Sequence, residues 1–288
     1  MFKLFRRSTQ VRFNPSLFNM GLSQSSVIET SIQNMSSTVN QAEVDKFSAM
    51  SSDWWNPRGV CKPLHSMNRL RVPLVRDGLM ETGVADPAMA DTDKPLQGVR
   101  ILDVGCGAGI LSEALARIGT DVTVEDICHD NIEAAKHHSE AAGDSLGNLR
   151  YICTSVEELA EAGPESFDAV VASEVVEHVA NPEMFVAVMA GLARPRGSVF
   201  LTTLSRTRLS WLVAILGAEY VAGLLPRGTH DWDKFITPRD LQKLVEAAGC
   251  QTRLVHGMAY NPLANSWCWI VDTSVNYALH AVKLDTDT

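Results

Sequence analysis

A short acidic segment, Ser173-Glu174-Val175-Val176-Glu177-His178-Val179, carries three side chains of the kinds that bind divalent cations. If a helical turn begins at Glu174, positions i, i+3 and i+4 fall on one side and bring Glu174, Glu177 and His178 together. Two carboxylates and an imidazole can then hold one cation. An acidic first turn favoured by the helix dipole, with the histidine completing local hydrogen bonds, explains the same spacing. Spacing alone leaves both interpretations open.

A glycine-rich turn stands upstream of this segment. The apolar run Val99–Val104 leads into Gly105-Cys106-Gly107-Ala108-Gly109 and then into a helical pattern, so a ligand can approach the backbone closely. A dinucleotide fingerprint requires Gly or Ala where Ile110 stands, which disfavours an NAD-dependent oxidoreductase. The turn instead resembles the D-V-G-C-G-x-G motif of class I methyltransferases, whose loop packs against S-adenosylmethionine. This resemblance covers residues 97–283 and implies that Gly105 and Gly107 contact the cofactor.

A carboxylate follows the glycine turn by about twenty residues. Asp126 ends the candidate strand Asp121–Glu125, where it can accept hydrogen bonds from both ribose hydroxyls of a cofactor. Glu125 competes for that role, and strand alternation predicts that only one of the two side chains faces the site. We select Asp126 because its spacing matches the class I pattern.

These residues need a sheet to position them. From Val99 onward, short β-branched or apolar runs alternate with longer amphipathic ones, which predicts an α/β fold of the class I methyltransferase (Rossmann-like) type with a seven-stranded, mostly parallel sheet and helices on both faces. The expected strands are residues 99–104, 121–125, 149–153, 167–172, 198–203, 251–258 and 267–271. The expected helices are residues 109–118, 131–142, 156–162, 182–193 and 238–248.

The region before the sheet divides into three parts. Residues 1–28 contain Lys3, Arg6, Arg7 and Arg12 but no Asp or Glu, which is typical of a mitochondrial transit peptide, with a disordered basic tail as the alternative. A polar run to Asn40 predicts a linker. Residues 41–96 are expected to form N-terminal helices, at 42–55 and 67–79, that help to cover the cofactor and substrate, and residues 97–288 the catalytic domain.

Composition narrows the class of protein. The chain has 288 residues, 45% of them hydrophobic, and a formal net charge of -9, so one globular domain is expected and a nucleic-acid partner is not. Its six cysteines are far apart and form no C-x-x-C pair, which argues against a zinc site and a disulfide framework.

Motifs along residues 41–283 resemble one subfamily, the ubiquinone-biosynthesis O-methyltransferases. Those that carry the resemblance include Trp54-Trp55-Asn56, Lys62-Pro63-Leu64-His65, Met67-Asn68-Arg69-Leu70-Arg71, Gly228-Thr229-His230-Asp231 and Tyr260-Asn261-Pro262. The resemblance implies that Arg71, Gly105, Asp126 and Ser173 bind the cofactor. It also implies that Glu174, Glu177 and His178 bind magnesium. The chain departs from the family at Arg69, where proline is usual, and at Ser173, where methionine is usual.

The family resemblance further implies a reaction and a location. The acceptor is a catechol hydroxyl of polyprenyl-dihydroxybenzoate, of demethylubiquinol or of both, in a complex with other ubiquinone-biosynthesis proteins on the matrix face of the mitochondrial inner membrane. Because a phenol has a pKa of about 10, a divalent cation that stabilises the oxyanion would assist transfer. His178 or a carboxylate could take the proton. A metal-independent methyltransferase and a catalytically silent, cofactor-binding scaffold subunit are the alternatives.

One further segment, residues 209–225, is almost long enough to span a membrane. Glu219, Gly217 and Gly223 interrupt it, so we expect an interfacial, membrane-contacting helix within an insertion at residues 206–228. Arg206, Arg208 and Arg227 would meet anionic headgroups. A helix buried as an active-site lid is the alternative.

Overall fold

The computed structural model describes residues 37–143, 146–162, 166–207, 210 and 234–285. The chain divides into two compact units, Met1–Ser37 and Thr38–Thr288, and the helices and strands named here belong to the second. The expected transit peptide and nearly all of the expected insertion at residues 206–228 lie outside the described residues. In the described part of the chain, no helix is both long enough and apolar enough to cross a membrane.

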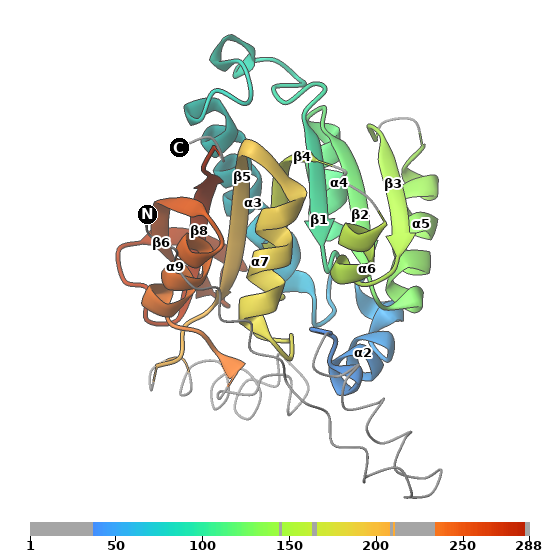
Figure 1. Ribbon diagram of the computed structural model, residues 1–288. Coiled ribbons are helices and arrows are strands. Elements are labelled where there is room, and N and C mark those ends of the chain that lie inside the picture. Colours follow the sequence, from blue (N-terminus) through green and yellow to red (C-terminus); the bar gives the residue numbers. More distant parts are fainter. Residues whose placement is uncertain (1–36, 144–145, 163–165, 208–209, 211–233, 286–288) are drawn as a thin grey trace, which may run out of the picture. The chain divides into compact units, whose positions relative to one another are not determined.

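An eight-stranded sheet runs through the described residues in the order β3-β2-β1-β4-β5-β8-β6-β7 (Figure 1). The strands pair in parallel from β3 to β5, and β8, β6 and β7 join antiparallel. The strands are β1 (Arg100–Val104), β2 (Asp121–Asp126), β3 (Leu149–Cys153), β4 (Phe167–Ser173), β5 (Ala193–Leu204), β6 (Cys250–Asn261), β7 (Ser266–Ile270) and β8 (Asn276–Lys283). The order reverses between β1 and β4, and ligands of open α/β sheets bind at such a reversal.

The expected count of seven strands is wrong by one, because β8 was missed. The strand Asn276–Lys283 is buried along nearly its whole length, so it shows no polar alternation. It also contains Ala278 and Ala281, which have low strand propensity. The α/β class and the mostly parallel sheet are confirmed.

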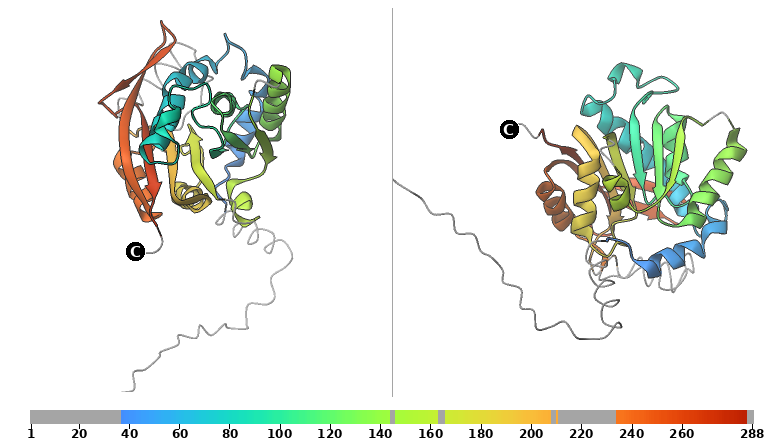
Figure 2. Two further views of the ribbon diagram at one scale, coloured as in Figure 1. Left: turned by 90° about the horizontal axis from the view of Figure 1, so that it is seen from above. Right: turned by 45° about the vertical axis from the view of Figure 1, so that its right-hand side comes forward.

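Helices cover both faces of the sheet, as expected. They are α3 (Lys62–Glu81), α4 (Ile110–Arg117), α5 (His129–Ala142), α6 (Val156–Glu161), α7 (Pro182–Leu192) and α9 (Pro238–Ala247). Neighbouring residues Ile101 and Leu102 of β1 belong to two different buried clusters, since alternate strand side chains point to opposite faces. The two turned views of Figure 2 show strands β6–β8, in orange and red, at the end of the sheet away from β3.

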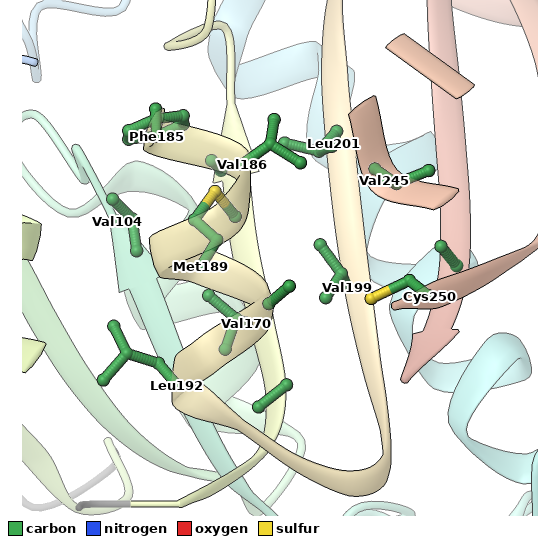
Figure 3. Packing of buried hydrophobic residues seen from close by; sticks show 14 of the residues in the cluster. Val104, Val170, Phe185, Val186, Met189, Leu192, Val199, Leu201, Val245 and Cys250 are labelled. Carbon is green, nitrogen blue, oxygen red and sulfur yellow. The ribbon is translucent and has the colours of Figure 1, made fainter. Parts of the chain in front are cut away.

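Helix α7 packs on the sheet with apolar residues spaced three or four apart, which is the spacing of one helix face. Its N-cap is Asn181, whose side chain accepts a hydrogen bond from the Met184 amide at 3.0 Å. Figure 3 shows the α7 side chains Phe185, Val186, Met189 and Leu192 beside the strand residues Val104, Val170, Val199 and Leu201. This packing fixes the end of β4 and therefore the acidic segment that follows it.

The N-terminal cover contains a shorter first helix than expected, and its folded structure begins earlier in the chain. Helix α2 (Gln41–Ser48) ends before the predicted residue 55, and a 3-10 turn (Ser51–Asp53) follows. Thr38, which the composition places in the linker, is buried. Its amide donates to Glu157 Oε1 at 2.6 Å, and its carbonyl accepts from the Ala180 amide at 2.8 Å. Folded structure therefore begins before Gln41.

Candidate active site

The glycine turn after β1 has a backbone that only glycine adopts without strain. Gly105, Gly107 and Gly109 have φ values of 62°, 55° and 79°. A Cβ on Gly107 would stand 2.7 Å from the Trp54 ring, and one on Gly105 would stand 2.8 Å from Val175. Both positions therefore need glycine for conformation and for space.

We expect Gly107→Ala to lower the free energy of unfolding by about 2 kcal/mol, because a left-handed residue with a Cβ costs about 1–2 kcal/mol and Trp54 must also move. The matched control is Gly191→Ala in α7, where an added Cβ meets nothing within 4 Å. Alanine in a helix is favoured over glycine by about 0.5–1 kcal/mol, so the control should be neutral or stabilising. Chemical denaturation measures both, and equal stabilities would contradict the prediction.

Asp126 closes the glycine turn from the end of β2. Its side chain is 7% exposed. It accepts hydrogen bonds from the amides of Gly107 at 2.8 Å and Cys128 at 2.7 Å, and from the Asn131 side chain at 3.4 Å. Burial raises its pKa to about 6, although those hydrogen bonds act in the opposite direction. A carboxylate held this rigidly can accept from a vicinal diol.

Glu125 and Asp126 both line the cavity, so the expectation that only one of them faces the site is wrong. The longer Glu125 side chain reaches the Gly105 amide, with Oε2 at 3.2 Å, one residue beyond its strand partner Val104. Burial, with the nearby Asp126, raises the pKa of Glu125 well above its usual range. Glu125 therefore holds the Gly105 end of the glycine turn, and Asp126 holds the Gly107 end.

Arg71 lies on α3 at the opposite wall and is only 5% exposed, so it is not an ordinary surface arginine. Its guanidinium donates to Ser173 Oγ at 2.8 Å, to the Leu64 carbonyl at 2.7 Å and to Asn68. Among the described residues its Nε has no hydrogen-bond partner. Burial lowers its pKa to about 10, which still leaves it charged at neutral pH. A buried cation with an unused donor suits a carboxylate ligand.

The acidic segment does not start a helical turn at Glu174. That residue has a left-handed backbone with φ 58°, and α7 begins only at Pro182. Glu174 and Glu177 nevertheless line the same cavity. Burial first, and then the charge of Glu174, raise the pKa of Glu177 well above its usual range. In the described structure Oε1 of each is buried and has no hydrogen-bond partner. Two carboxylates with unused oxygens fit a divalent cation.

His178 lines the same cavity but turns toward the N-terminal cover. Its Nδ1 lies 3.0 Å from Glu43 Oε2, and its ring meets Phe47 edge-on with centroids 5.0 Å apart. Burial lowers the pKa of His178, although Glu43 acts to raise it. Among the described residues, no group of three or more His, Cys, Asp and Glu side chains is arranged to hold a metal. The structure thus brings Glu174 and Glu177 together and leaves His178 on Glu43.

One cavity of about 350 Å³ joins these groups. Gly105, Gly107 and Asp126 lie on its wall together with Arg71 and the acidic segment. Apolar and aromatic side chains make up much of the remaining wall: Val44, Phe47, Met50, Leu64, Val179, Phe185, Leu204, Tyr260 and Trp267. The cavity can therefore hold a polar cofactor beside a largely apolar second ligand.

Comparison with known proteins agrees with this geometry. Residues 72–255 match the protein family described as Methyltransferase domain. The mitochondrial ubiquinone biosynthesis O-methyltransferase of Rattus norvegicus is 45% identical over 248 residues, covering 86% of this chain and 71% of that one. The human protein is 44% identical over 246 residues, covering 85% and 66%. The Sinorhizobium fredii enzyme is 44% identical, covering 85% and 96%.

The chain belongs to the ubiquinone biosynthesis O-methyltransferase family. Among solved structures, magnesium protoporphyrin IX methyltransferase from Synechocystis PCC 6803 with bound SAM has a TM-score of 0.53 at 17% identity, and the match covers 92% of this chain and 99% of that one. That likeness shows the class I methyltransferase fold. The chain is a methyltransferase that uses S-adenosylmethionine.

The structure gives the contacts by which the N-terminal cover meets the site. Trp54 packs over the glycine turn and donates from Nε1 to Asn131 at 3.1 Å, while Trp55 Nε1 donates to the Ala108 carbonyl at 2.9 Å. Glu43, which holds His178, was missed altogether. The Trp54-Trp55-Asn56 motif could have indicated the tryptophan contacts at the glycine turn. A single glutamate in a polar helix gave no signal for the contact between Glu43 and His178.

Proposed function

We propose that this family member transfers a methyl group from S-adenosylmethionine to a catechol hydroxyl of polyprenyl-dihydroxybenzoate, of demethylubiquinol or of both, assisted by a divalent cation such as Mg²⁺. The observation that carries the proposal is one cavity that joins a cofactor-binding wall to a pair of buried carboxylates with unpartnered oxygens. Relatives 44–45% identical are named as ubiquinone biosynthesis O-methyltransferases, which supports the substrate class.

At the cofactor end, each group has one task. The Gly105 and Gly107 turn gives the cofactor close access to the backbone, and Asp126 accepts from the two ribose hydroxyls. Arg71 binds the cofactor's carboxylate through its unused donor, and Ser173 holds Arg71 in place at 2.8 Å. These contacts orient the sulfonium methyl toward the acceptor, and orientation can supply roughly 7 to 11 kcal/mol of the barrier in favourable cases.

At the acceptor end, Glu174 and Glu177 fit a divalent cation because each keeps one buried oxygen without a partner in the described structure. When bound there, the cation would act as a Lewis acid that lowers the pKa of the catechol hydroxyl. His178 can complete the ligand set or accept the phenolic proton. Glu43 lies 3.0 Å from its Nδ1, and a carboxylate at that position is compatible with either role.

The acceptor carries a hydrophobic tail, which fits the apolar part of the cavity and a location at a membrane. Phe47, Tyr260 and Trp267 give an apolar wall suited to an aromatic ring with a prenyl chain. Residues 1–28 are basic and contain no Asp or Glu, and the rat and human relatives are named as mitochondrial; both facts support a mitochondrial location. Within the mitochondrion, the proposed place is the matrix face of the inner membrane, beside other enzymes of the pathway.

A polyprenyl acceptor resides in lipid, so we also propose that residues 206–228 bind the membrane surface as an interfacial segment. Flotation with anionic liposomes tests this. The wild type should float and a Trp211→Asp, Leu212→Asp variant should float less, whereas equal flotation by both would defeat the idea.

The deciding experiment for function is a methyl-transfer assay with a short-chain dihydroxybenzoate, with and without added Mg²⁺ after chelation. We expect transfer that depends strongly on the ion. Undiminished transfer after exhaustive chelation would favour a metal-independent methyltransferase. No transfer under either condition, with normal cofactor binding, would favour a silent scaffold subunit.

A further inference from the structure

Two neighbouring threonines end the apolar part of β5 beside the acidic segment. Thr202 and Thr203 are 4% and 0% exposed, and Thr202 is the strand partner of Ser173. A hydroxyl buried this deeply needs hydrogen bonds, since an unpaired one costs about 1–3 kcal/mol. The hydrogen-bond acceptors of these two hydroxyls therefore show which groups of the site they hold.

Each threonine serves one of the two carboxylates. Thr203 Oγ1 donates to Glu177 Oε2 at 2.8 Å. The Thr202 hydroxyl hydrogen-bonds the Glu174 side chain, and the Thr202 carbonyl accepts from the Glu174 amide at 2.9 Å. Adjacent strand residues ordinarily point to opposite faces. Here each hydroxyl nevertheless reaches a carboxylate of the segment that follows β4, where Glu174 has a left-handed backbone.

The direction of donation around Thr202 follows from counting protons. Ser173 Oγ lies 2.8 Å from both Arg71 Nη1 and Thr202 Oγ1. Arginine can only donate, and an ionised carboxylate can only accept. When Glu174 is ionised, as a cation ligand must be, Thr202 donates its one proton to Glu174 and Ser173 donates to Thr202. The order in that state is Arg71 to Ser173 to Thr202 to Glu174.

We propose that Thr202 and Thr203 are positioning residues that fix Glu174 and Glu177 so that one oxygen of each is presented to the divalent cation. The inference rests on the proposed function, because it assumes that these carboxylates bind the cation. In both cases the threonine engages the glutamate, and Oε1 stays buried without a partner among the described residues. Hydroxyl donors fix a carboxylate's rotation without adding charge, so they orient a ligand and leave its affinity for cations intact.

The test measures Mn²⁺ binding directly, by electron paramagnetic resonance titration of the full chain with S-adenosylhomocysteine present. Groups that orient metal ligands typically contribute about 10–100-fold in metal affinity. Thr203→Val, which keeps the shape and removes the donor, should bind Mn²⁺ roughly tenfold to a hundredfold more weakly than the wild type. Thr203→Ser restores the donor and should recover most of the affinity.

Two controls separate positioning from general damage. Thr252→Val on β6 makes the same change at a buried hydroxyl that has no hydrogen-bond partner in the described chain, and it should bind Mn²⁺ like the wild type. S-adenosylhomocysteine affinity should be unchanged in Thr203→Val. If that variant fails to fold, Thr202→Val carries the test at Glu174 with the same expected loss.

The outcomes distinguish the two proposals. Suppose that the wild type binds Mn²⁺ and Thr203→Val binds it equally well, or that Thr203→Ser does not recover the lost affinity. Either result overturns the positioning role and leaves the proposed function standing. If the wild type binds no Mn²⁺ in the presence of S-adenosylhomocysteine, both the metal-assisted function and the positioning role are overturned.

Discussion

Replacing Glu177 with glutamine is expected to lower kcat for a short-chain dihydroxybenzoate by roughly three orders of magnitude, with S-adenosylhomocysteine affinity close to that of the wild type. A Lewis acid at a developing oxyanion contributes several kcal/mol, and each 1.4 kcal/mol or so is a factor of ten in rate. Glu177 is 2% exposed and keeps a buried oxygen without a described partner, so the amide cannot replace the lost charge. Steady-state kinetics at saturating cofactor and Mg²⁺, with calorimetry of product binding, measure both quantities.

The matched control is Glu113→Gln. Glu113 is equally buried, but it lies on α4, where it accepts from Arg117 at 3.1 Å and lies 2.6 Å from His138 Nδ1. Its loss should affect stability and leave kcat within a few fold. A Glu177→Gln enzyme that keeps kcat within tenfold of the wild type and still responds to Mg²⁺ would show that the ion binds elsewhere or is not needed.

Asp126→Ala is expected to weaken cofactor binding by at least about a hundredfold. In the proposed binding mode, two ribose hydroxyls donate to this carboxylate. Hydrogen bonds to charged groups are worth about 1.5–3 kcal/mol each, and each 1.4 kcal/mol or so is a tenfold change in affinity. The change also leaves the Gly107 and Cys128 amides without their acceptor. Calorimetric titration with S-adenosylhomocysteine measures the loss. A thermal melt separates it from unfolding, and a folded variant with near-normal affinity would refute the ribose role.

The pH dependence of cofactor affinity provides a second test of the same residue. Burial raises the pKa of Asp126 to about 6 in the free protein, so below that pH the carboxyl is protonated. Ribose hydroxyls favour the ionised form. Affinity should therefore be full above pH 6 and decline as the pH falls through 6. Asp103 is also buried, with its pKa raised to about 6. If Asp126 is responsible, Asp126→Asn loses the dependence, whereas a variant that keeps it would implicate Asp103.

The cofactor half of the site was largely predictable from sequence because local geometry determines it. A strand, a glycine turn and a helix leave little freedom, and Asp126 ends the next strand, which is the parallel neighbour of β1. Arg71 could be placed only by resemblance, since nothing in its local pattern shows that α3 buries it against Ser173, 102 residues away. Local patterns carry no record of such contacts.

The acidic segment shows where sequence reasoning fails. Spacing of i, i+3 and i+4 predicts one side of a helix, but Glu174 adopts a left-handed conformation that non-glycine residues seldom take. His178 pairs with Glu43, which is 135 residues distant in the chain. Strand β8 was missed for a related reason, because a strand buried on both faces lacks the alternation that marks a half-buried one. In each case tertiary packing overrides the local signal.

The two backbone hydrogen bonds of Thr38 bear on the proposed mitochondrial leader. Its backbone joins the start of α6, through Glu157, to the loop before α7, through Ala180, and it lies on the cavity wall. If the proposed mitochondrial leader is removed by a protease, a cut upstream of Thr38 would leave both hydrogen bonds intact. A cut a few residues further along would remove them and free one wall of the cavity. The position of Thr38 therefore limits where such a leader could end.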